Sequence, residues 1–303
     1  MGPMTLPIVH NPNYNADLPA DHRFPIGKFR RLAEILMEDG LVGPGGFQVP
    51  AEAEANWIAL AHDRTYVDQV FSGQVPAKIE REIGFPMNET VVTRARCAVA
   101  GTVLAARLAL DHGIACNTAG GSHHARRGHG AGFCVFNDVG VAANVLRADG
   151  AIERALVIDC DVHQGDGTAD VFRDDPAMFT FSIHAEKNYP VRKVASDLDV
   201  GLADATGDDE YLQTLGDILP GLIDAHRPDI VFFNAGVDPH HQDRLGRLAL
   251  TDAGLIARDR TVIETVRQKR IPIACVIGGG YSTDIDALAR RHAGLYRVAS
   301  DFV

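Results

Sequence analysis

The 303-residue chain lacks the cysteine patterns that mark disulfide frameworks and cysteine-ligated metal sites. It contains five cysteines, an odd number, and no two of them form a CxxC pair. Widely separated single cysteines are typical of small buried thiols in a reducing compartment. The sequence therefore predicts neither a disulfide framework nor a cysteine zinc site.

Long apolar segments are also missing. No stretch approaches the roughly 18 uninterrupted apolar residues that a membrane span needs, and the N-terminal MGPMTLPIVHNPNYNADLP has no apolar signal-peptide core. We therefore expect a protein that is neither exported nor inserted in a membrane, with a cytoplasmic location.

Positive charge is scarce. The chain has 29 Lys and Arg against 40 Asp and Glu, which gives a formal net charge of -11. Such a balance argues against a phosphate-binding surface, so nucleic acid is not expected as a direct partner. Two interpretations of the acidic balance remain open. It attracts a cationic substrate, such as a lysine-bearing peptide or a polyamine, or it serves solubility alone.

What the chain does contain, from about residue 150 onward, is a series of short apolar runs separated by helical patterns. Strands that are apolar on both faces and alternate with helices predict a parallel sheet between helical layers. The runs are ALVIDCDV, AMFTFSIH, DIVFFNAGVD and IPIACVIGGGY. Mainly helical stretches are expected before them, near residues 27–39, 52–61, 63–71 and 89–111.

Nothing in the sequence divides this pattern into separate units. There is no low-complexity linker, no internal repeat and no shift in composition. We therefore predict that residues 1–303 form a single domain, an α/β three-layer sandwich with a central, mostly parallel sheet.

Polar side chains follow the predicted strands at the points where they end. Open α/β sheets bind ligands beyond the carboxyl ends of their strands, so these segments should converge on one crevice. The residues are Asp159, Asp161, His163, His184, Asn234, Asp238 and Gly278 to Tyr281.

The segment VIDCDVHQGDG carries the clearest metal signal. Asp159, Asp161 and His163 are spaced by two, which places their side chains on one face of a strand. Ionisable groups on an apolar strand are costly to bury unless they are paired or bound to a metal. We predict that Asp161, His163 and Asp238 hold a catalytic divalent ion, either Zn²⁺ or Fe²⁺.

The stretch AGGSHHARRGHGAGF places His123 beside His124 in a glycine-rich loop. Adjacent histidines with spare carboxylates nearby suggest two histidine–carboxylate dyads, one acting as a base and the other as a donor. We pair His123 with Asp159 and His124 with Asp166, although spacing alone does not decide this pairing. A carboxylate on Nδ1 fixes the tautomer and raises the basicity of each ring.

Three glycines precede Tyr281 in VIGGGYS, so the backbone can approach a ligand closely there. The Tyr281 hydroxyl could donate a hydrogen bond to a developing oxyanion. The alternative is an ordinary tyrosine at a strand end.

Taken in order, the segments GGSHH, GHGAGFCVFND, DCDVHQGDG, FSIHAEKNYP, NAGVDPHHQDRLG and GGGY resemble the zinc-dependent histone deacetylase family of the arginase/deacetylase superfamily. The similarity runs from HRFPIGKF to the final helix and is most like a bacterial class IV-type deacetylase. It implies an arginase-like α/β sandwich that hydrolyses an Nε-acyl-lysine or similar amide to an amine and a carboxylate.

The resemblance also implies roles for individual residues. It supports Asp161, His163 and Asp238 as metal ligands, with the tandem histidines and Tyr281 as catalytic groups. It places Gly132, Phe133 and Tyr189 in an acyl-lysine tunnel, with Gly279 beside it; there Phe133 would sheathe the methylenes of the lysine. It further implies a monovalent cation, K⁺ or Na⁺, held by Asp159, Asp161, His163 and Ser182.

The chain departs from the family in one loop. Where many members have an aspartate that grips the substrate backbone, GFPMNET offers only Asn88 and Glu89. Arg126, Arg127 and His129 receive no role, and we expect them on a solvated loop face.

Three alternatives stay open. The substrate could be an acylated polyamine or another small-molecule amide. An arginase-type ureohydrolase shares the fold but needs two metals, and the chain has no DxDxxDP run. A non-catalytic acyl-lysine-binding module would have lost a ligand or the tyrosine, and none is missing here.

Overall fold

The computed structural model describes residues 5–303, and one seven-stranded sheet runs through this part of the chain. The strand order is β1-β2-β7-β6-β3-β4-β5, and every pair of neighbours is parallel. The strands are β1 (Ile8–Val9), β2 (Ile114–Asn117), β3 (Ala155–Asp159), β4 (Met178–Ala185), β5 (Leu198–Leu202), β6 (Ile230–Asn234) and β7 (Ile273–Val276). The α/β sandwich predicted from the sequence is confirmed.

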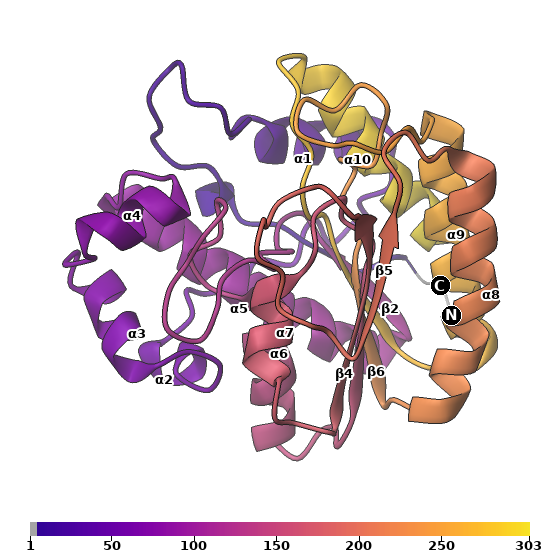
Figure 1. Ribbon diagram of the computed structural model, residues 1–303, viewed down its shortest axis with the longest axis horizontal. Helices are drawn as coiled ribbons and strands as arrows, with labels where there is room; N and C mark the ends of the chain where they lie inside the picture. Colours follow the sequence, from indigo (N-terminus) through magenta and orange to yellow (C-terminus); the bar gives the residue numbers. More distant parts are fainter. Residues whose placement is uncertain (1–4) are drawn as a thin grey trace.

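Helices cover both faces of the sheet (Figure 1). The first layer contains α5 (Glu89–His112), α6 (Asp138–Ala148) and α7 (Asp166–Phe172), and beyond it lie α2 (Ala55–Ile58), α3 (Arg64–Phe71) and α4 (Ala77–Ile83). The second layer contains α8 (Asp208–His226), α9 (Asp252–Gln268) and α10 (Ile285–Ala299), with α1 (Lys28–Glu38) packed on α10. Two short 3-10 helices are η1 (Pro12–Tyr14) and η2 (Ser300–Phe302).

The central strands are buried on both faces, which explains their continuous apolar sequences. The four apolar runs identified in the sequence become β3, β4, β6 and β7. Strands β1, β2 and β5 were not predicted, because β1 and β2 are very short and β5 alternates exposed and half-buried positions. The helix expected near residues 52–61 is also shorter than predicted, since α2 covers only Ala55–Ile58.

The sheet register brings the predicted polar residues together. Asp159, the last residue of β3, is paired with Ser182 of β4 and with Asn234 of β6. The segments that follow these three strands therefore lie side by side at the carboxyl edge of the sheet. Ligands of open parallel sheets bind at this edge.

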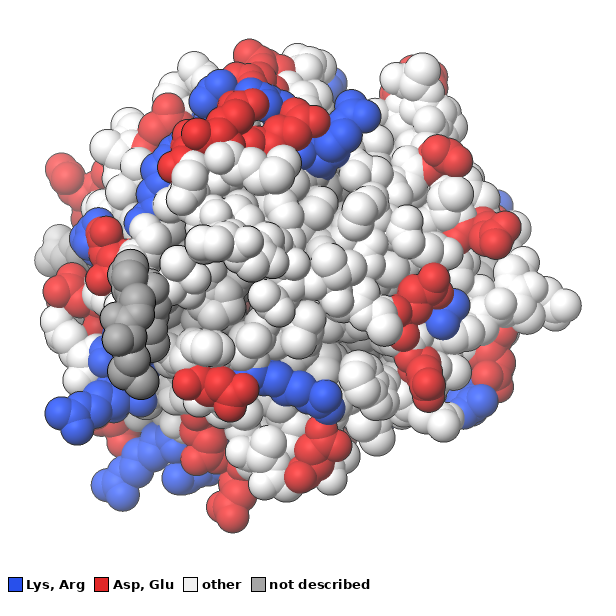
Figure 2. All heavy atoms as spheres, turned by 180° about the vertical axis from the view of Figure 1, so that it is seen from behind, with Lys and Arg blue, Asp and Glu red and all other residues white. Residues whose placement is uncertain are grey.

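Charge on the surface is mixed. Figure 2 shows one face on which acidic and basic side chains lie around the periphery and the middle is largely uncharged. None of the helices within residues 5–303 is both long and apolar enough to span a bilayer.

Asn137 connects the histidine-bearing loop to the helices beneath it. Its side chain caps α6 by accepting a hydrogen bond from the Gly140 N–H at 2.8 Å. Its amide group donates to the Ala125 carbonyl at 3.2 Å and to the Thr168 hydroxyl at 3.0 Å, and the side chain is fully buried. The loop is thus fixed to the starts of two helices.

We predict that Asn137→Ala lowers the free energy of unfolding by about 2–4 kcal/mol, because a cap is lost and buried polar partners are left unsatisfied. Asn88→Ala is the matched control. Asn88 caps α5 through the Val91 N–H but is exposed, so its loss should cost about 1 kcal/mol. Urea unfolding measures both, and equal losses would contradict the role assigned to Asn137.

Candidate active site

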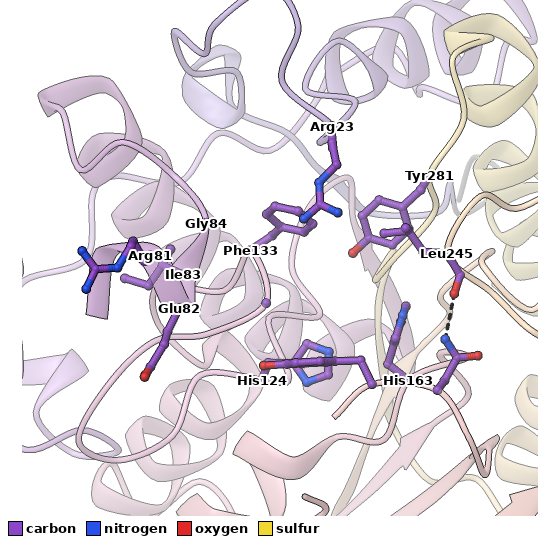
Figure 3. A pocket seen from close by; sticks show the side chains of 13 residues that line it. Arg23, Arg81, Glu82, Ile83, Gly84, His124, Phe133, His163, Leu245 and Tyr281 are labelled. Atoms are coloured by element: carbon purple, nitrogen blue, oxygen red, sulfur yellow. Dashed lines mark hydrogen bonds between the residues drawn. The ribbon is translucent and has the colours of Figure 1, made fainter. Parts of the chain in front are cut away.

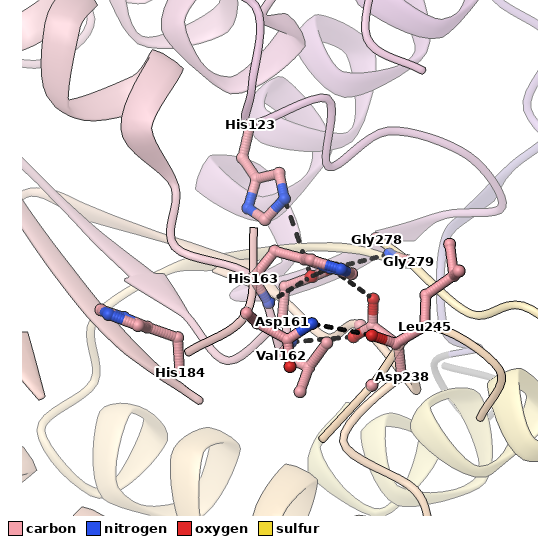
Figure 4. A network of polar contacts seen from close by, with 12 residues as sticks. His123, Asp161, Val162, His163, His184, Asp238, Leu245, Gly278 and Gly279 are labelled. Carbon is pink, nitrogen blue, oxygen red and sulfur yellow. Dashed lines mark hydrogen bonds and ion pairs between the residues drawn. The ribbon is translucent and has the colours of Figure 1, made fainter. Parts of the chain in front are cut away.

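Three buried side chains converge just beyond the ends of β3 and β6 (Figure 4). The Nδ1 atom of His163 lies 3.0 Å from an Asp161 carboxylate oxygen and 3.1 Å from an Asp238 carboxylate oxygen. One ligand atom from each residue lies within 4.8 Å of the others. These are the three positions that the sequence analysis selected as metal ligands.

Backbone N–H groups orient the two carboxylates. Asp238 accepts a hydrogen bond from the Val162 N–H at 2.8 Å. Asp161 accepts from its neighbour His163 at 3.0 Å and from the distant Gly279 at 2.7 Å. Because Val162 is 76 residues from Asp238 and Gly279 is 118 residues from Asp161 in the sequence, the surrounding fold determines the carboxylate geometry.

The charges of this cluster favour a cation. Burial and the nearby charge of Asp161 raise the pKa of Asp238 to about 7. Burial opposes the charged form of His163, but the two carboxylates outweigh burial and raise its pKa to about 10. Two carboxylates and one imidazole at these positions fit Zn²⁺ or Fe²⁺, which both bind mixed nitrogen and oxygen ligands.

The tandem histidines form two dyads. The Nδ1 atom of His123 lies 2.7 Å from Asp159, and the Nδ1 atom of His124 lies 2.6 Å from Asp166. The two imidazole rings are 4.1 Å apart between their centroids. The structure thus has the two pairs that were assigned from the sequence, where spacing alone did not decide between them.

The two dyads have opposite electrostatic settings. Burial disfavours the charged form of His123, but the carboxylates of Asp159 and Asp161 outweigh burial and raise its pKa to about 9. Burial together with the charge of His123 lowers the pKa of His124 to about 4. At neutral pH the geometry therefore favours a protonated His123 beside a neutral His124.

Asn234 supports the first dyad. Its amide nitrogen donates to Asp159 at 2.9 Å, so the Asp159 carboxylate is held between Asn234 and His123. The sequence analysis placed Asn234 at a strand end but gave it no role. Only the three-dimensional register of β3 and β6 shows its contact with Asp159.

Arg126 supports the second dyad, and the expectation that it lies on a solvated loop face is wrong. Its Nε and Nη2 atoms donate to one oxygen of Asp166 at 3.0 and 2.6 Å, while the other oxygen contacts His124. With Arg126 and His124 as partners, the pKa of the buried Asp166 stays below its usual value even though burial opposes the charged form. Arg127 is exposed and His129 is half-buried.

Tyr281 lies in the segment that follows β7 and forms one wall of the site. Its backbone N–H donates to Asp243 at 2.6 Å, and its ring lies 6.1 Å from the His163 ring at nearly a right angle. Burial and the charge of Asp238 raise the pKa of the phenol well above its ordinary value. The hydroxyl therefore stays protonated and points into the pocket as a donor (Figure 3).

A pocket of about 310 Å³, called the mouth pocket below, leads from the surface to these residues (Figure 3). Gly132, Phe133 and Tyr189 line it, as the resemblance implied. Phe133 has a backbone φ of 65°, a strained value for a non-glycine residue, and its N–H donates to the Ile83 carbonyl at 2.7 Å. Tyr189 presents its ring edge-on to His124 at 4.7 Å.

Gly279 and Ser182 lie outside the mouth pocket. Gly279 packs directly against the Asp161–His163–Asp238 cluster, where its N–H donates to Asp161 and an added Cβ would clash with Asp238. Ser182 is the register neighbour of Asp159, and its hydroxyl is 3.0 Å from the Nδ1 atom of His184. The structure thus places Ser182 beside Asp159, another of the four residues that the resemblance implied for a monovalent cation.

The fold and the site together define a class: an α/β sandwich with a candidate metal cluster and two histidine–carboxylate dyads at the carboxyl edge of a parallel sheet. This arrangement is typical of metal-dependent hydrolases. The family model for the histone deacetylase domain matches residues 22–296. The chain therefore belongs to the histone deacetylase family.

Individual relatives agree with this assignment. An uncharacterized protein of Picosynechococcus sp. is 48% identical over 98% of this chain and 99% of its own length. Histone deacetylase 2 of Arabidopsis thaliana is 31% identical, covering 86% of this chain and 70% of the relative. A probable deacetylase of Methanothermobacter thermautotrophicus is 28% identical, covering 96% and 89%.

Among solved structures, the HD domain of HDA15 has the same fold. It superposes with a TM-score of 0.81 at 20% sequence identity and covers 98% of this chain and 89% of its own.

We predict that Gly279→Ala lowers metal affinity by about 10–100-fold, because the new Cβ would displace both Asp238 and Asp161. Gly216→Ala in α8 is the matched control, since an added Cβ meets no atom within 4 Å there. Elemental analysis after dialysis measures the bound metal. Full metal content in Gly279→Ala would contradict the close packing described.

Proposed function

We propose that the protein is a metal-dependent deacylase that hydrolyses the amide of an Nε-acyl-lysine side chain, or of a similar acylated amine. The observation that carries the proposal is the convergence of the Asp161–His163–Asp238 cluster, the two dyads and Tyr281. Of these groups, His124, His163 and Tyr281 line the mouth pocket. Residues 1–303 are proposed to act as a single catalytic domain.

Asp161, His163 and Asp238 would hold the metal, with Zn²⁺ as the first candidate and Fe²⁺ as the second. When bound, such an ion polarises the substrate carbonyl and makes water a better nucleophile. We further propose that Ser182 and Asp159 contribute with Asp161 and His163 to a structural K⁺ or Na⁺ site.

His124 is the proposed base. Its contact with Asp166 occupies Nδ1 and leaves Nε2 to accept a proton, and its low pKa keeps the ring neutral. Water adds to the carbonyl carbon as its proton passes to His124. The C–N bond then breaks, the leaving amine takes a proton from a protonated histidine, and a carboxylate and an amine are released.

His123 and Tyr281 stabilise the charge that develops. His123, held by Asp159, contributes positive charge close to the cluster. The Tyr281 hydroxyl donates to the oxygen of the tetrahedral intermediate, which is the part of the substrate that becomes negative. Phe133 and Tyr189 pack along the methylenes of the lysine side chain and exclude water.

The rim of the mouth pocket favours a lysine side chain over a free polyamine. Arg23 and Arg81 line this rim, and within residues 5–303 neither has a carboxylate within 4.0 Å. Glu82 is the acidic residue among the side chains that line the mouth pocket. Unneutralised arginines repel a substrate that carries further ammonium groups beyond the acylated one.

We predict that Tyr281→Phe lowers kcat on an acetyl-lysine peptide by about 10²–10³-fold with metal content unchanged, because one oxyanion donor is removed. Tyr211→Phe, which removes a buried phenol from α8 outside the pocket, is the control and should keep its kcat. Steady-state kinetics with purified variants provides the test. A wild-type rate in Tyr281→Phe would exclude the tyrosine from the chemistry.

We also predict one metal ion per chain and loss of turnover after treatment with a chelator. The part of the chain that the structure describes offers a single cluster of suitable ligands. Restoring Zn²⁺ or Fe²⁺ should restore acetyl-lysine hydrolysis. Two ions per chain with activity on a guanidino substrate would favour the ureohydrolase alternative instead.

A further inference from the structure

Helix α9 turns a charged side chain toward the interior. Its buried positions recur every three or four residues, which is the spacing of a helix face that packs on a core. Arg258 occupies one of these positions, between the buried Leu255 and Val262, and is itself fully buried. A guanidinium is costly to bury, so its contacts must replace the water that it loses.

Every N–H group of the Arg258 guanidinium has an acceptor. Nε and Nη2 donate to one carboxylate oxygen of the adjacent Asp259, at 3.0 and 2.7 Å. Nη1 donates to the carbonyls of Cys160, at 3.3 Å, and Gly236, while Nη2 also donates to the Ala235 carbonyl at 3.3 Å. A guanidinium has five N–H groups in one rigid plane, so these five bonds fix its orientation.

The three carbonyls belong to the two chain segments that carry the candidate metal ligands. Cys160 immediately precedes Asp161, and Gly236 lies two residues before Asp238. Both segments lie past the ends of β3 and β6. Gly236 also packs so closely on Asp161 that an added Cβ would clash with its carboxylate. One side chain from α9 therefore joins both segments, and a change in their separation would displace the carboxylates.

Asp259 balances the charge of Arg258 inside the protein. The two side chains form a buried ion pair at 2.7 Å. Because the pair adds little net charge beside Asp161 and Asp238, attraction to these carboxylates does not explain why the guanidinium is there. What it supplies is a planar fork that contacts several acceptors at fixed angles, which the single ammonium group of a lysine does not offer.

We propose that Arg258 is a positioning residue for the metal site. Its guanidinium holds segments 160–161 and 235–238 at the separation that Asp161 and Asp238 need in order to share one ion. The inference rests on the metal site of the proposed function, although not on the reaction that the ion serves. Residues that orient metal ligands without touching the metal change metal affinity by roughly 10–100-fold.

Competition with a chromophoric chelator for Zn²⁺ measures the effect on affinity. We expect Arg258→Met/Asp259→Asn to bind Zn²⁺ about 10–100-fold more weakly than the wild type. The second substitution avoids leaving a buried carboxylate unpaired. Asp259→Asn alone keeps the guanidinium and should bind Zn²⁺ as the wild type does. Arg260→Met is the matched control, because Arg260 of the same helix pairs with Asp301 at the surface.

Two results of this titration would overturn the proposal. Wild-type Zn²⁺ affinity in the double variant would show that the carbonyl contacts of Arg258 do not matter to the ion. Equal weakening in Asp259→Asn alone would assign the effect to the buried charge rather than to those contacts.

A spectroscopic readout separates positioning from general stabilisation. Co²⁺ bound in place of Zn²⁺ absorbs visible light at wavelengths that depend on the ligand geometry. At saturating Co²⁺, the double variant should show bands that are shifted from those of the wild type and of Arg260→Met. Arg258→Lys, which keeps the charge but not the planar fork, should show a shift as well. Lower stability in urea with unchanged bands would make Arg258 a purely structural residue, and the proposal would fail.

Amide hydrogen exchange tests the wild type without any variant. The Cys160 N–H donates to the Asn234 carbonyl at 3.0 Å and the Val237 N–H to the Gly279 carbonyl at 2.9 Å, so these amides report on both segments. We expect both to exchange slowly in the metal-free protein, with little change when Zn²⁺ is added. Fast exchange that Zn²⁺ suppresses would show that the ion orders the segments, which contradicts the role assigned to Arg258.

Hydrolysis of an acetyl-lysine peptide, measured in parallel, keeps this inference apart from the proposed function. Together the two predict hydrolysis that requires more Zn²⁺ in the double variant than in the wild type. If Zn²⁺ binding depends on Arg258 but no peptide is hydrolysed, the proposed function fails and the positioning role stands. If the double variant hydrolyses the peptide and binds Zn²⁺ as the wild type does, the positioning role fails and the proposed function stands.

Discussion

The burial of two carboxylates beside one imidazole is the constraint on which the site depends. Asp161 and Asp238 lie in an interior where like charges repel strongly, and His163 alone does not balance them. Backbone donors from Val162 and Gly279 hold them in place. A divalent cation held by these three side chains would place positive charge between the two carboxylates.

The parallel sheet explains how residues from distant parts of the chain meet. Strands β3 and β6 end in register, which places their following segments side by side. The two dyads then differ only in their surroundings. Asn234 and the Asp161–His163–Asp238 cluster lie near the His123 dyad, while Arg126 contacts the carboxylate of the His124 dyad. This difference is what separates a charged histidine from a neutral one.

Much of this architecture can be predicted from the sequence, and there is a physical reason why the rest of it cannot. The spacing of Asp161 and His163 selected the right pair for the wrong reason, because β3 ends at Asp159 and both residues lie in the bend that follows it. Buried apolar runs correctly predicted the four strands β3, β4, β6 and β7. The dyad pairing and the role of Arg126 depend on contacts about 40 residues apart, which no local pattern encodes.

The most direct test of the account is anomalous diffraction from a crystal of the purified protein, collected at the absorption edge of the bound metal. The account predicts a single strong peak per chain, about 2.0–2.2 Å from the nearest atoms of Asp161, His163 and Asp238. A peak at another site, a second peak of equal strength beside it, or no peak between these three side chains would contradict it.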